Sequence, residues 1–457
     1  MKANIEAERN LSGYLELVQN NRNFRYLWLG QIVSLLGDWF NLIASASLVA
    51  SLTESGLAVG GLFVVRMLAP FLVSPLAGVA ADRYNRKRLL IAADLARAVV
   101  LLGFLLVREP QHVWLLYTLT ALQLGISGFF FPTRNAILPD IVSRRELGAA
   151  NALSSATWSV MLAFGAALGG IVAGEWGVYP SFIVDALTFA LSALLIGQVV
   201  YRHAPADGSE DHSVAAALKE YAGGLRYMWQ NKDIMVIAWH KAAISLVVSG
   251  AFQVVQVTLA ERIFVIGEGG GTGLGIMYAT VGIGTGVGPI FLRRYTGDRS
   301  RPMRIALGLS YVVAAIGLAI MAPLASFPVV LLGILLRGFG SGINWVFSTQ
   351  LLLQLLPDRV RGRVFSTEFA LLTLTNATGA AIGGLVLDAQ QFDLSTLLWW
   401  MAALTFVPAA LWFLWMVFGP EPAKPQAAPE DENDASAQEG VPPTEGALTR
   451  SSHLQRR

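Results

Sequence analysis

Long apolar segments separated by short polar ones extend over most of the chain. Each apolar run is about 20 residues or longer, which at about 1.5 Å per residue of helix is enough to cross about 30 Å of hydrocarbon. The apolar positions are continuous rather than alternating, and this pattern favours helices over a barrel. We therefore predict an all-α polytopic membrane protein with twelve spans, at residues 24–51, 57–81, 89–107, 113–134, 148–174, 178–200, 233–262, 271–293, 302–322, 328–350, 363–388 and 394–418.

A polar stretch near the middle of the chain separates six spans from the other six. Its second part carries apolar residues at helical spacing, which predicts a helix lying on the membrane surface. The last residues are rich in Pro, Ala, Glu and Asp and cannot bury a core. The predicted organisation is an N-terminal cytoplasmic segment at 1–23, a six-helix bundle at 24–200, a central loop at 201–232, a second six-helix bundle at 233–418, and a disordered cytoplasmic tail at 419–457.

Basic residues are concentrated in the loops on one side of the predicted spans. The opposite loops hold little beyond Arg108 and Arg262. Because cytoplasmic loops carry the excess of Lys and Arg, we expect both termini and the central loop in the cytoplasm of a cell whose inner membrane holds the protein. The residues that carry this asymmetry are Arg83, Arg86, Lys87, Arg88, Arg144, Arg145, Arg293, Arg294, Arg299, Arg301, Arg304, Arg359, Arg361 and Arg363.

The composition narrows the functional classes. The chain is 54% hydrophobic and 14% charged, and its formal net charge is only +2, so no nucleic-acid partner is implied. It has no cysteine, which excludes disulfides, zinc thiolate sites and thiol catalysis. It has no Gly-x-x-x-x-Gly-Lys-Ser/Thr string, so no ATP site of that kind is expected.

The two halves of the chain repeat one another. Residues 165–172 (Gly-Ala-Ala-Leu-Gly-Gly-Ile-Val) match residues 379–386 (Gly-Ala-Ala-Ile-Gly-Gly-Leu-Val), and Leu-Pro-Asp occurs at both 138–140 and 356–358. A duplication of six spans indicates two related domains, with a substrate site between them near the middle of the membrane.

A charged string at residues 78–88 leaves the second span. It reads Gly-Val-Ala-Ala-Asp-Arg-Tyr-Asn-Arg-Lys-Arg and resembles the Gly-x-x-x-Asp-Arg-x-Gly-Arg-Arg/Lys loop of the major facilitator superfamily, with Asn85 in place of the second Gly. Residues 23–39 and 185–189 resemble a branch that includes the enterobactin and macrolide exporters, which are twelve-span drug:proton antiporters. The resemblance implies two pseudo-symmetric six-helix bundles and transport by alternating access.

Two positions differ from the antiporter pattern. Many such proteins carry Gly-Pro in the fifth span, where this chain has Gly165-Ala166, and many carry an Arg in the fourth span, where this chain has Gln123.

Four charged residues fall at one predicted depth. Counted at about 1.5 Å per residue, Asp38, Arg66, Asp185 and Arg337 all lie about 20 to 22 Å from the cytoplasmic ends of their spans. Because charges inside a membrane are costly, each one requires a partner or a function. We place Gln123 and Asn344 in the same layer as polar residues that contact the substrate.

Each of these charges has two interpretations. Asp38 is the leading proton carrier, or it pairs permanently with Arg66. Asp185 is a second proton-coupling candidate, or a buried acid that is satisfied by hydrogen bonds within its half. Arg337 and Arg66 hold an anionic group of the substrate, or they neutralise the charge of Asp38 or Asp185.

Other charged residues in the spans are expected to be structural. Asp94 and Arg97 are three residues apart, so they form a pair on one helix face. Lys241 is expected to extend toward the cytoplasm, and Glu368 to favour the N-terminus of its helix.

The loop after the second span is expected to act as a gate. Its residues are Gly78, Asp82, Arg83, Arg86 and Lys87. Gly78 allows close helix approach, and Asp82 is placed over the N-terminus of the span at 363–388, where it would hold the cytoplasmic side shut. The alternative is that the basic residues serve only topology and lipid contact.

Together these features predict a secondary transporter that exports a hydrophobic or amphiphilic small molecule in exchange for protons. The alternatives are transport of a lysophospholipid or another anionic solute, or a non-transporting sensor or scaffold. Its expected partners are the substrate, protons and membrane lipids, and we expect a monomer that is not an enzyme and needs no cofactor and no metal.

Overall fold

The computed structural model describes residues 14–143, 146–201, 214–297, 299–389 and 393–418. Within these ranges twelve helical segments are long and apolar enough to cross a membrane, as predicted. The predicted N-terminal segment lies largely outside the described residues, and the predicted tail at 419–457 lies wholly outside them.

The first half contains six of these segments. They are α2 (Arg22–Thr53), α3 (Gly56–Arg83), α4 (Arg86–Gly103), α5 (Val113–Ile141), α6 (Leu147–Glu175) and α7 (Val178–Gly197). The short helices η1 (Phe104–Leu106) and η2 (Pro110–His112) connect α4 to α5. Between the halves, α8 (Val214–Gln230) is the helix predicted in the central loop.

The second half begins with a segment that is not a uniform α-helix. It runs through α9 (Lys232–Ile244), η3 (Ser245–Gly250), α10 (Ala251–Thr258) and η4 (Leu259–Ile263), and both η3 and η4 are π-helical turns. The remaining elements are η5 (Glu268–Gly270), α11 (Gly271–Thr296), α12 (Ser300–Met321), α13 (Phe327–Leu355), α14 (Asp358–Asp388) and α15 (Leu394–Phe418).

Side-chain caps set several helix starts. The side chain of Asn21 accepts from Phe24 N at 3.0 Å before α2, and Ser55 Oγ accepts from Ala58 N at 3.1 Å before α3. Asn85, which replaces the expected glycine in the charged loop, accepts from Arg88 N at 3.1 Å and caps α4. The substitution at Asn85 therefore has a local purpose, because a helix start needs an acceptor for its free N–H groups.

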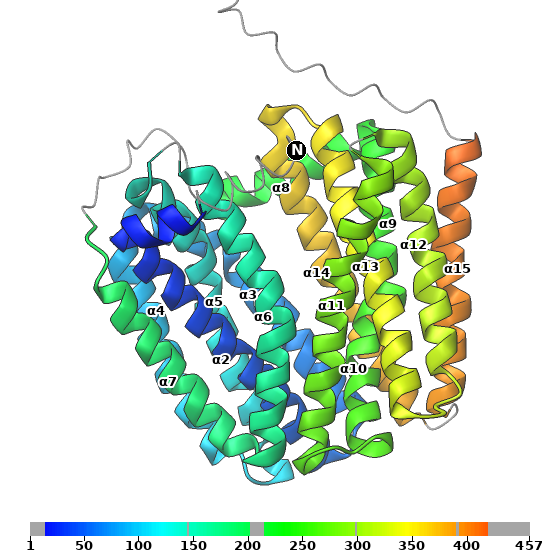
Figure 1. Ribbon diagram of the computed structural model, residues 1–457, viewed down its shortest axis with the longest axis horizontal. Helices are drawn as coiled ribbons and strands as arrows, with labels where there is room; N and C mark the ends of the chain where they lie inside the picture. Colours follow the sequence, from blue (N-terminus) through cyan, green and yellow to red (C-terminus); the bar gives the residue numbers. More distant parts are fainter. Residues whose placement is uncertain (1–13, 144–145, 202–213, 298, 390–392, 419–457) are drawn as a thin grey trace, which may run out of the picture.

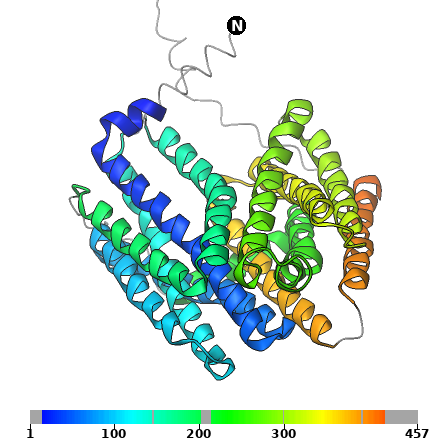
Figure 2. The ribbon, with the colours of Figure 1, turned by 60° about the horizontal axis from the view of Figure 1, so that its bottom comes forward.

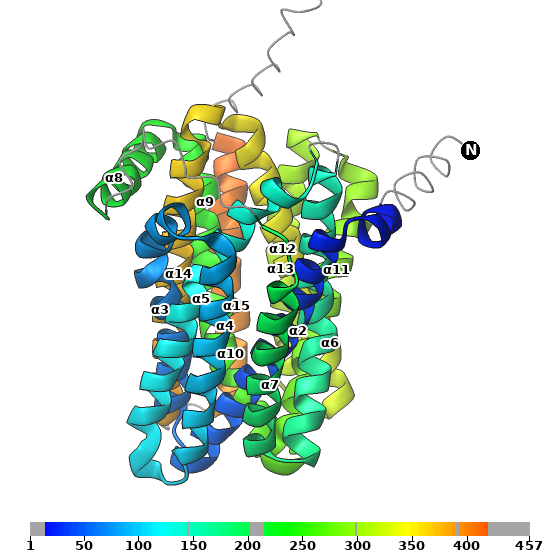
Figure 3. The same ribbon diagram turned by 90° about the vertical axis from the view of Figure 1, so that its left-hand side faces the viewer.

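The two halves stand side by side and meet at one end. Figure 1 shows the helices of the first half (α2 to α7, blue to green) and those of the second half (α9 to α15, green to orange) converging at the end opposite α8. Figure 2, turned to bring that end forward, shows the two groups of helices in contact. In Figure 3, α8 lies at the opposite end, where its Gly224 packs against Arg363 and Thr367 of α14.

Close backbone contacts at glycines join the two halves at the seam. Gly170 of α6 faces Gly275 of α11 so closely that an added Cβ would lie 2.5 Å from the Gly275 Cα. On the other side of the seam, a Cβ at Gly60 of α3 would lie 2.6 Å from the carbonyl oxygen of Ala380 of α14. Small residues let helix backbones approach in this way inside membranes.

Candidate functional site

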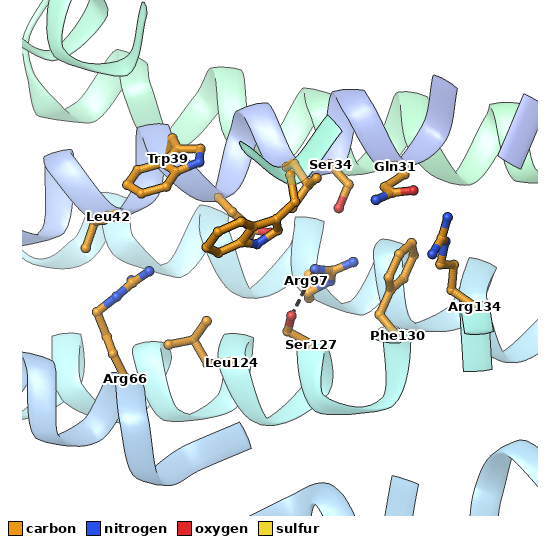
Figure 4. Close-up of a pocket in the computed structure, with 13 residues that line it drawn as sticks. Gln31, Ser34, Trp39, Leu42, Arg66, Arg97, Leu124, Ser127, Phe130 and Arg134 are labelled. Carbon is orange, nitrogen blue, oxygen red and sulfur yellow. Dashed lines mark hydrogen bonds between the residues drawn. The ribbon is translucent and has the colours of Figure 1, made fainter. Parts of the chain in front are cut away.

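A cavity of about 250 Å³ opens within the first half. Its 13 lining residues come from α2, α3, α4, α5 and α6, and they include Asp38, Trp39, Arg66, Arg97 and Phe130. Figure 4 shows Arg66, Arg97 and Arg134 spaced along the cavity, with the rings of Trp39 and Phe130 also facing it. A charged and aromatic cavity among apolar helices is therefore the candidate site.

Asp38 and Arg66 both line this cavity, but they do not form the simple pair considered from the sequence. Asp38 Oδ1 accepts from Gln123 Nε2 at 3.2 Å, and Arg66 Nη1 donates to Asn41 Oδ1 at 3.2 Å. Asp38 interacts electrostatically with Arg97 and Arg66, yet no ion pair joins it to either of them in the described part of the chain. Asp38 is thus left with a weak neutral donor inside a cationic cavity.

Asp185 is brought near Asp38 but does not line the cavity. It lies fully buried on α7 behind α2, where a Cβ at Gly37 would sit 2.1 Å from its Oδ1. Thr188 Oγ1 lies 3.3 Å from the same oxygen, and the other carboxylate oxygen has no partner among the described residues. Asp38 and Asp185 are therefore neighbours, but only Asp38 lines the cavity.

Arg97 belongs to the site, a role the sequence did not reveal. It forms the predicted ion pair with Asp94, which also accepts from Ser192 Oγ at 2.6 Å. Its guanidinium lies 4.0 Å from the centre of the Phe189 ring and 4.9 Å from that of Phe130, and it lines the cavity. The three-residue spacing gave the pair, but nothing in the sequence showed that the pair borders a cavity.

Arg134 is a second cavity residue that the sequence did not single out. Its guanidinium donates to Ser154 and to Asn135. Arg134 follows an aromatic run in α5. The only sequence feature that could have identified it is its position as a charged residue in a predicted span.

The second half holds its own polar residues at a separate place. Arg337 stacks over the ring of Phe252 at 4.0 Å and forms no ion pair with Asp38 or Asp185. Asn344 donates to the hydroxyl of Tyr311 at 3.0 Å within the core of this half. Neither Arg337 nor Asn344 lines the cavity, whose described lining comes from the first half alone. The common depth of the layer stays a prediction.

The side chains of Lys241 and Glu368 do not make the contacts that the sequence predicted. Lys241 does not extend toward the membrane surface, because its Nζ binds Glu368 Oε1 at 2.9 Å and Thr349 Oγ1 at 3.0 Å, under the ring of Trp345. Glu368 lies ten residues after the start of α14 and so does not stabilise its first turn. Because Lys241 and Glu368 are far apart in the sequence, no sequence pattern indicated that they form an ion pair.

One aromatic contact connects the cavity to the second half. The ring of Trp39, which lines the cavity, lies 5.7 Å from the ring of Tyr278 of α11. The Tyr278 hydroxyl is buried without a hydrogen-bond partner in the described residues, and both Arg66 and Arg337 act on it electrostatically. Tyr278 therefore interacts electrostatically with a basic residue of each half.

The predicted gating loop is only partly visible. Arg86 Nη1 donates to Asp140 Oδ2 at 2.8 Å, and Lys87 Nζ donates to the carbonyl of Gly197 at 2.7 Å, so both residues tie α4 to neighbours within the first half. The side chains of Asp82 and Arg83 and the surroundings of Gly78 lie outside the described part of the structure, and the proposed latch stays a prediction.

Comparisons with known proteins agree with this architecture. The chain is 25% identical over 383 residues to the uncharacterized MFS-type transporter YfiS of Bacillus subtilis (strain 168), covering 81% of this chain and 88% of that protein. It is 26% identical over 389 residues to the multidrug resistance protein MdtG of Rahnella sp. (strain Y9602), again covering 81% and 88%.

A solved structure has the same fold. The inward-facing crystal structure of a bacterial homologue of the iron transporter ferroportin superposes with a TM-score of 0.64 at 15% identity, covering 86% of this chain and 98% of that one. The family model of the Major Facilitator Superfamily matches residues 27–367 and 269–454. With its twelve spans in two bundles, this chain belongs to the major facilitator superfamily.

Proposed function

We propose that this transporter of the major facilitator superfamily exports a hydrophobic or amphiphilic small molecule, such as a drug, macrolide or siderophore, in exchange for protons. The observation that carries the proposal is Asp38, an acid lining a membrane-embedded cavity beside Arg66 and Arg97. The similarity to a multidrug resistance protein supports the direction of transport. The aromatic rings in the cavity wall suit an apolar substrate.

Asp38 provides a means of exchange. Its hydrogen bond comes from the neutral amide of Gln123, so its protonation requires no buried ion pair to be broken. When the acid is ionised, its charge offsets part of the positive charge of the cavity, and when it is protonated that offset is lost. Binding of a proton and binding of substrate therefore influence one another through a single carboxyl group, as an exchange mechanism requires.

The contacts at the seam fit one state of an alternating-access cycle. The halves meet at the end opposite α8, where Arg262 of η4 donates to the carbonyl of Glu54 between α2 and α3. With the basic loops placed in the cytoplasm, this state is closed to the outside and faces the cytoplasm. Opening the seam and closing the other end would release substrate outward, by movement of one half against the other.

The test is transport in proteoliposomes with an imposed pH gradient. Purified full-length protein would be given a panel of cationic, neutral and anionic amphiphilic dyes, and dye accumulation and internal pH would be followed together. We expect accumulation of at least one dye to be driven by the gradient, to reverse when the gradient is reversed, and to be accompanied by counter-movement of protons. Gradient-independent movement would contradict exchange.

A further inference from the structure

We propose that Arg337 and the hydroxyl of Tyr278 form a seat for the carboxylate of an amphiphilic substrate. This inference rests on the proposed transport function and names the chemistry of the transported molecule. The seat lies in the second half, beside the junction with the cavity, and does not involve Asp38.

The charge of Arg337 is not balanced by the protein. Only 6% of the residue is exposed, and the described part of the chain offers it no ion pair and no hydrogen bond, only the face of Phe252 at 4.0 Å. A buried cation without a counter-ion is costly inside a membrane, and a ring face offsets only part of that cost. The position is therefore understandable if a negative group visits it.

Other buried basic residues show what a satisfied site looks like in this protein. Arg97 binds Asp94, Lys241 binds Glu368 at 2.9 Å, and Arg304 Nη2 lies 3.4 Å from Asp233 Oδ2. Arg134, which has no carboxylate, donates to Ser154 and Asn135 instead. Arg337 has neither kind of partner, which sets it apart from all four.

Tyr278 supplies the second observation. The residue is 7% exposed, and its hydroxyl has no partner among the described residues, although a buried hydroxyl normally has one. Arg66 and Arg337 are the two basic groups that act on it electrostatically. The helices that carry Arg337 and Tyr278 touch about one turn away, where a Cβ at Gly338 would lie 3.0 Å from the carbonyl oxygen of Val281. Arg337 offers only donors and the unpartnered phenol offers an O–H, so an acceptor that reaches both groups would satisfy them.

A carboxylate fits this requirement better than a neutral acceptor. Its two oxygens match the fork of an arginine and accept charge-assisted hydrogen bonds. Tyr278 also contacts Trp39, which lines the cavity, so the apolar part of the same molecule can lie against that ring. The seat and the cavity together predict a molecule with one acidic group and an apolar body.

The experiment compares two probes that differ in a single charge. Dansylamino-undecanoic acid and its methyl ester are titrated into full-length protein in nanodiscs, at constant pH and with no gradient, and binding is followed by energy transfer from tryptophan to dansyl. Signal from nanodiscs of the same lipid without the protein is subtracted as lipid partition. Because no transport is measured, loss of proton coupling would not affect the result, and a failure here would leave exchange itself untouched.

The variants are Arg337→Gln, Arg337→Lys, Tyr278→Phe and, as a matched control, Arg301→Gln at an exposed position. We expect wild type to prefer the acid over the ester, and Arg337→Gln to weaken binding of the acid about 10- to 100-fold with little effect on the ester, as for loss of a charge-assisted hydrogen bond. Tyr278→Phe should weaken the acid several-fold, Arg337→Lys should keep part of the preference, and Arg301→Gln should match wild type.

Three results would overturn the proposal. Equal binding of acid and ester by wild type would reject a carboxylate-binding site. An equal loss of affinity for both probes in Arg337→Gln would show that Arg337 has a packing role only. Displacement of the probe by lysophosphatidic acid but not by decanoate would replace the carboxylate with a phosphate headgroup. If Arg337→Gln does not fold, Tyr278→Phe decides, because an unchanged preference for the acid in that variant rejects the seat.

Discussion

Asp388, the last residue of α14, caps the first turn of α3 together with Ser55. Its Oδ2 accepts from Ser55 Oγ at 2.5 Å and from Leu57 N at 3.0 Å, and its Oδ1 accepts from Gly56 N at 2.5 Å. A carboxylate is favoured at a helix N-terminus by the free N–H groups and the helix dipole. Since α14 and α3 belong to different halves, this cap holds the halves together.

Replacing Asp388 with Asn should loosen the closed end. Loss of a charged cap is worth about 2 kcal/mol, which corresponds to a roughly 30-fold change in the ratio of closed to open molecules. The chain has no cysteine, so pairs of introduced cysteines can be spin-labelled without background. Distances measured between labels on α3 and α14 should lengthen in the variant.

Asp393 provides the matched control for that change. It lies five residues further along and accepts from Thr396 N at 3.0 Å, so it caps its own half rather than the other one. Asp393→Asn should leave the label distances unchanged. If both variants or neither shift the distances, the cap at α3 does not hold the seam.

An alanine at Gly170 should prevent the halves from meeting. The added Cβ would lie 2.5 Å from Gly275 Cα and 2.9 Å from the carbonyl oxygen of Gly271, and backbone atoms cannot move aside as side chains do. We expect fewer closed molecules by spin-label distances and slower transport. Gly286→Ala is the control, because nothing lies within 4 Å of its added Cβ, and an equal effect there would argue against a steric cause.

Replacing Asp38 with Asn should uncouple transport from the proton gradient. The amide keeps the size of the side chain and its neighbourhood to Gln123 but cannot take up a proton. In proteoliposomes we expect dye binding to persist while accumulation no longer responds to an imposed pH difference. Gradient-driven accumulation at the wild-type rate would remove Asp38 from the coupling mechanism and leave Asp185 as the acid to test.

Replacing Glu368 with Gln should destabilise the second half. The change leaves Lys241 buried without its counter-ion, a loss of about 3 kcal/mol or more when one partner of a buried pair is removed. The melting temperature of the purified protein should fall. The double variant Lys241→Met with Glu368→Leu should recover much of it, and a double variant no better than the single one would show that the pair itself is not the cause.

The spans were predictable because the membrane leaves the backbone little choice. A chain that crosses lipid must satisfy its own N–H and C=O groups, so continuous apolar runs become helices. The predicted span at 233–262 corresponds to a helical segment at Lys232–Ile263, although its π-helical turns were not foreseen. Those turns depend on packing, such as the approach of Gly250 to the backbone of Asn376.

The site was less predictable because hydropathy does not fix the rotation of a helix about its axis. Both the lipid-facing and the packed faces of a span are apolar, so depth along the helix can be counted but direction cannot. Asp38 and Arg66 both line the cavity, whereas Asp185 of the same predicted layer lies buried behind α2. The pairing of Lys241 with Glu368 joins residues 127 positions apart, and no local pattern encodes it.

The glycine contact between α6 and α11 has a kinetic consequence. Where two backbones touch without interleaved side chains, separation does not require any side chain to withdraw from a hole or to change rotamer first. The activation barrier for parting the halves at that place is then set by contact area and by the few polar bonds at its rim. Parting the halves at that place therefore requires no prior repacking of side chains.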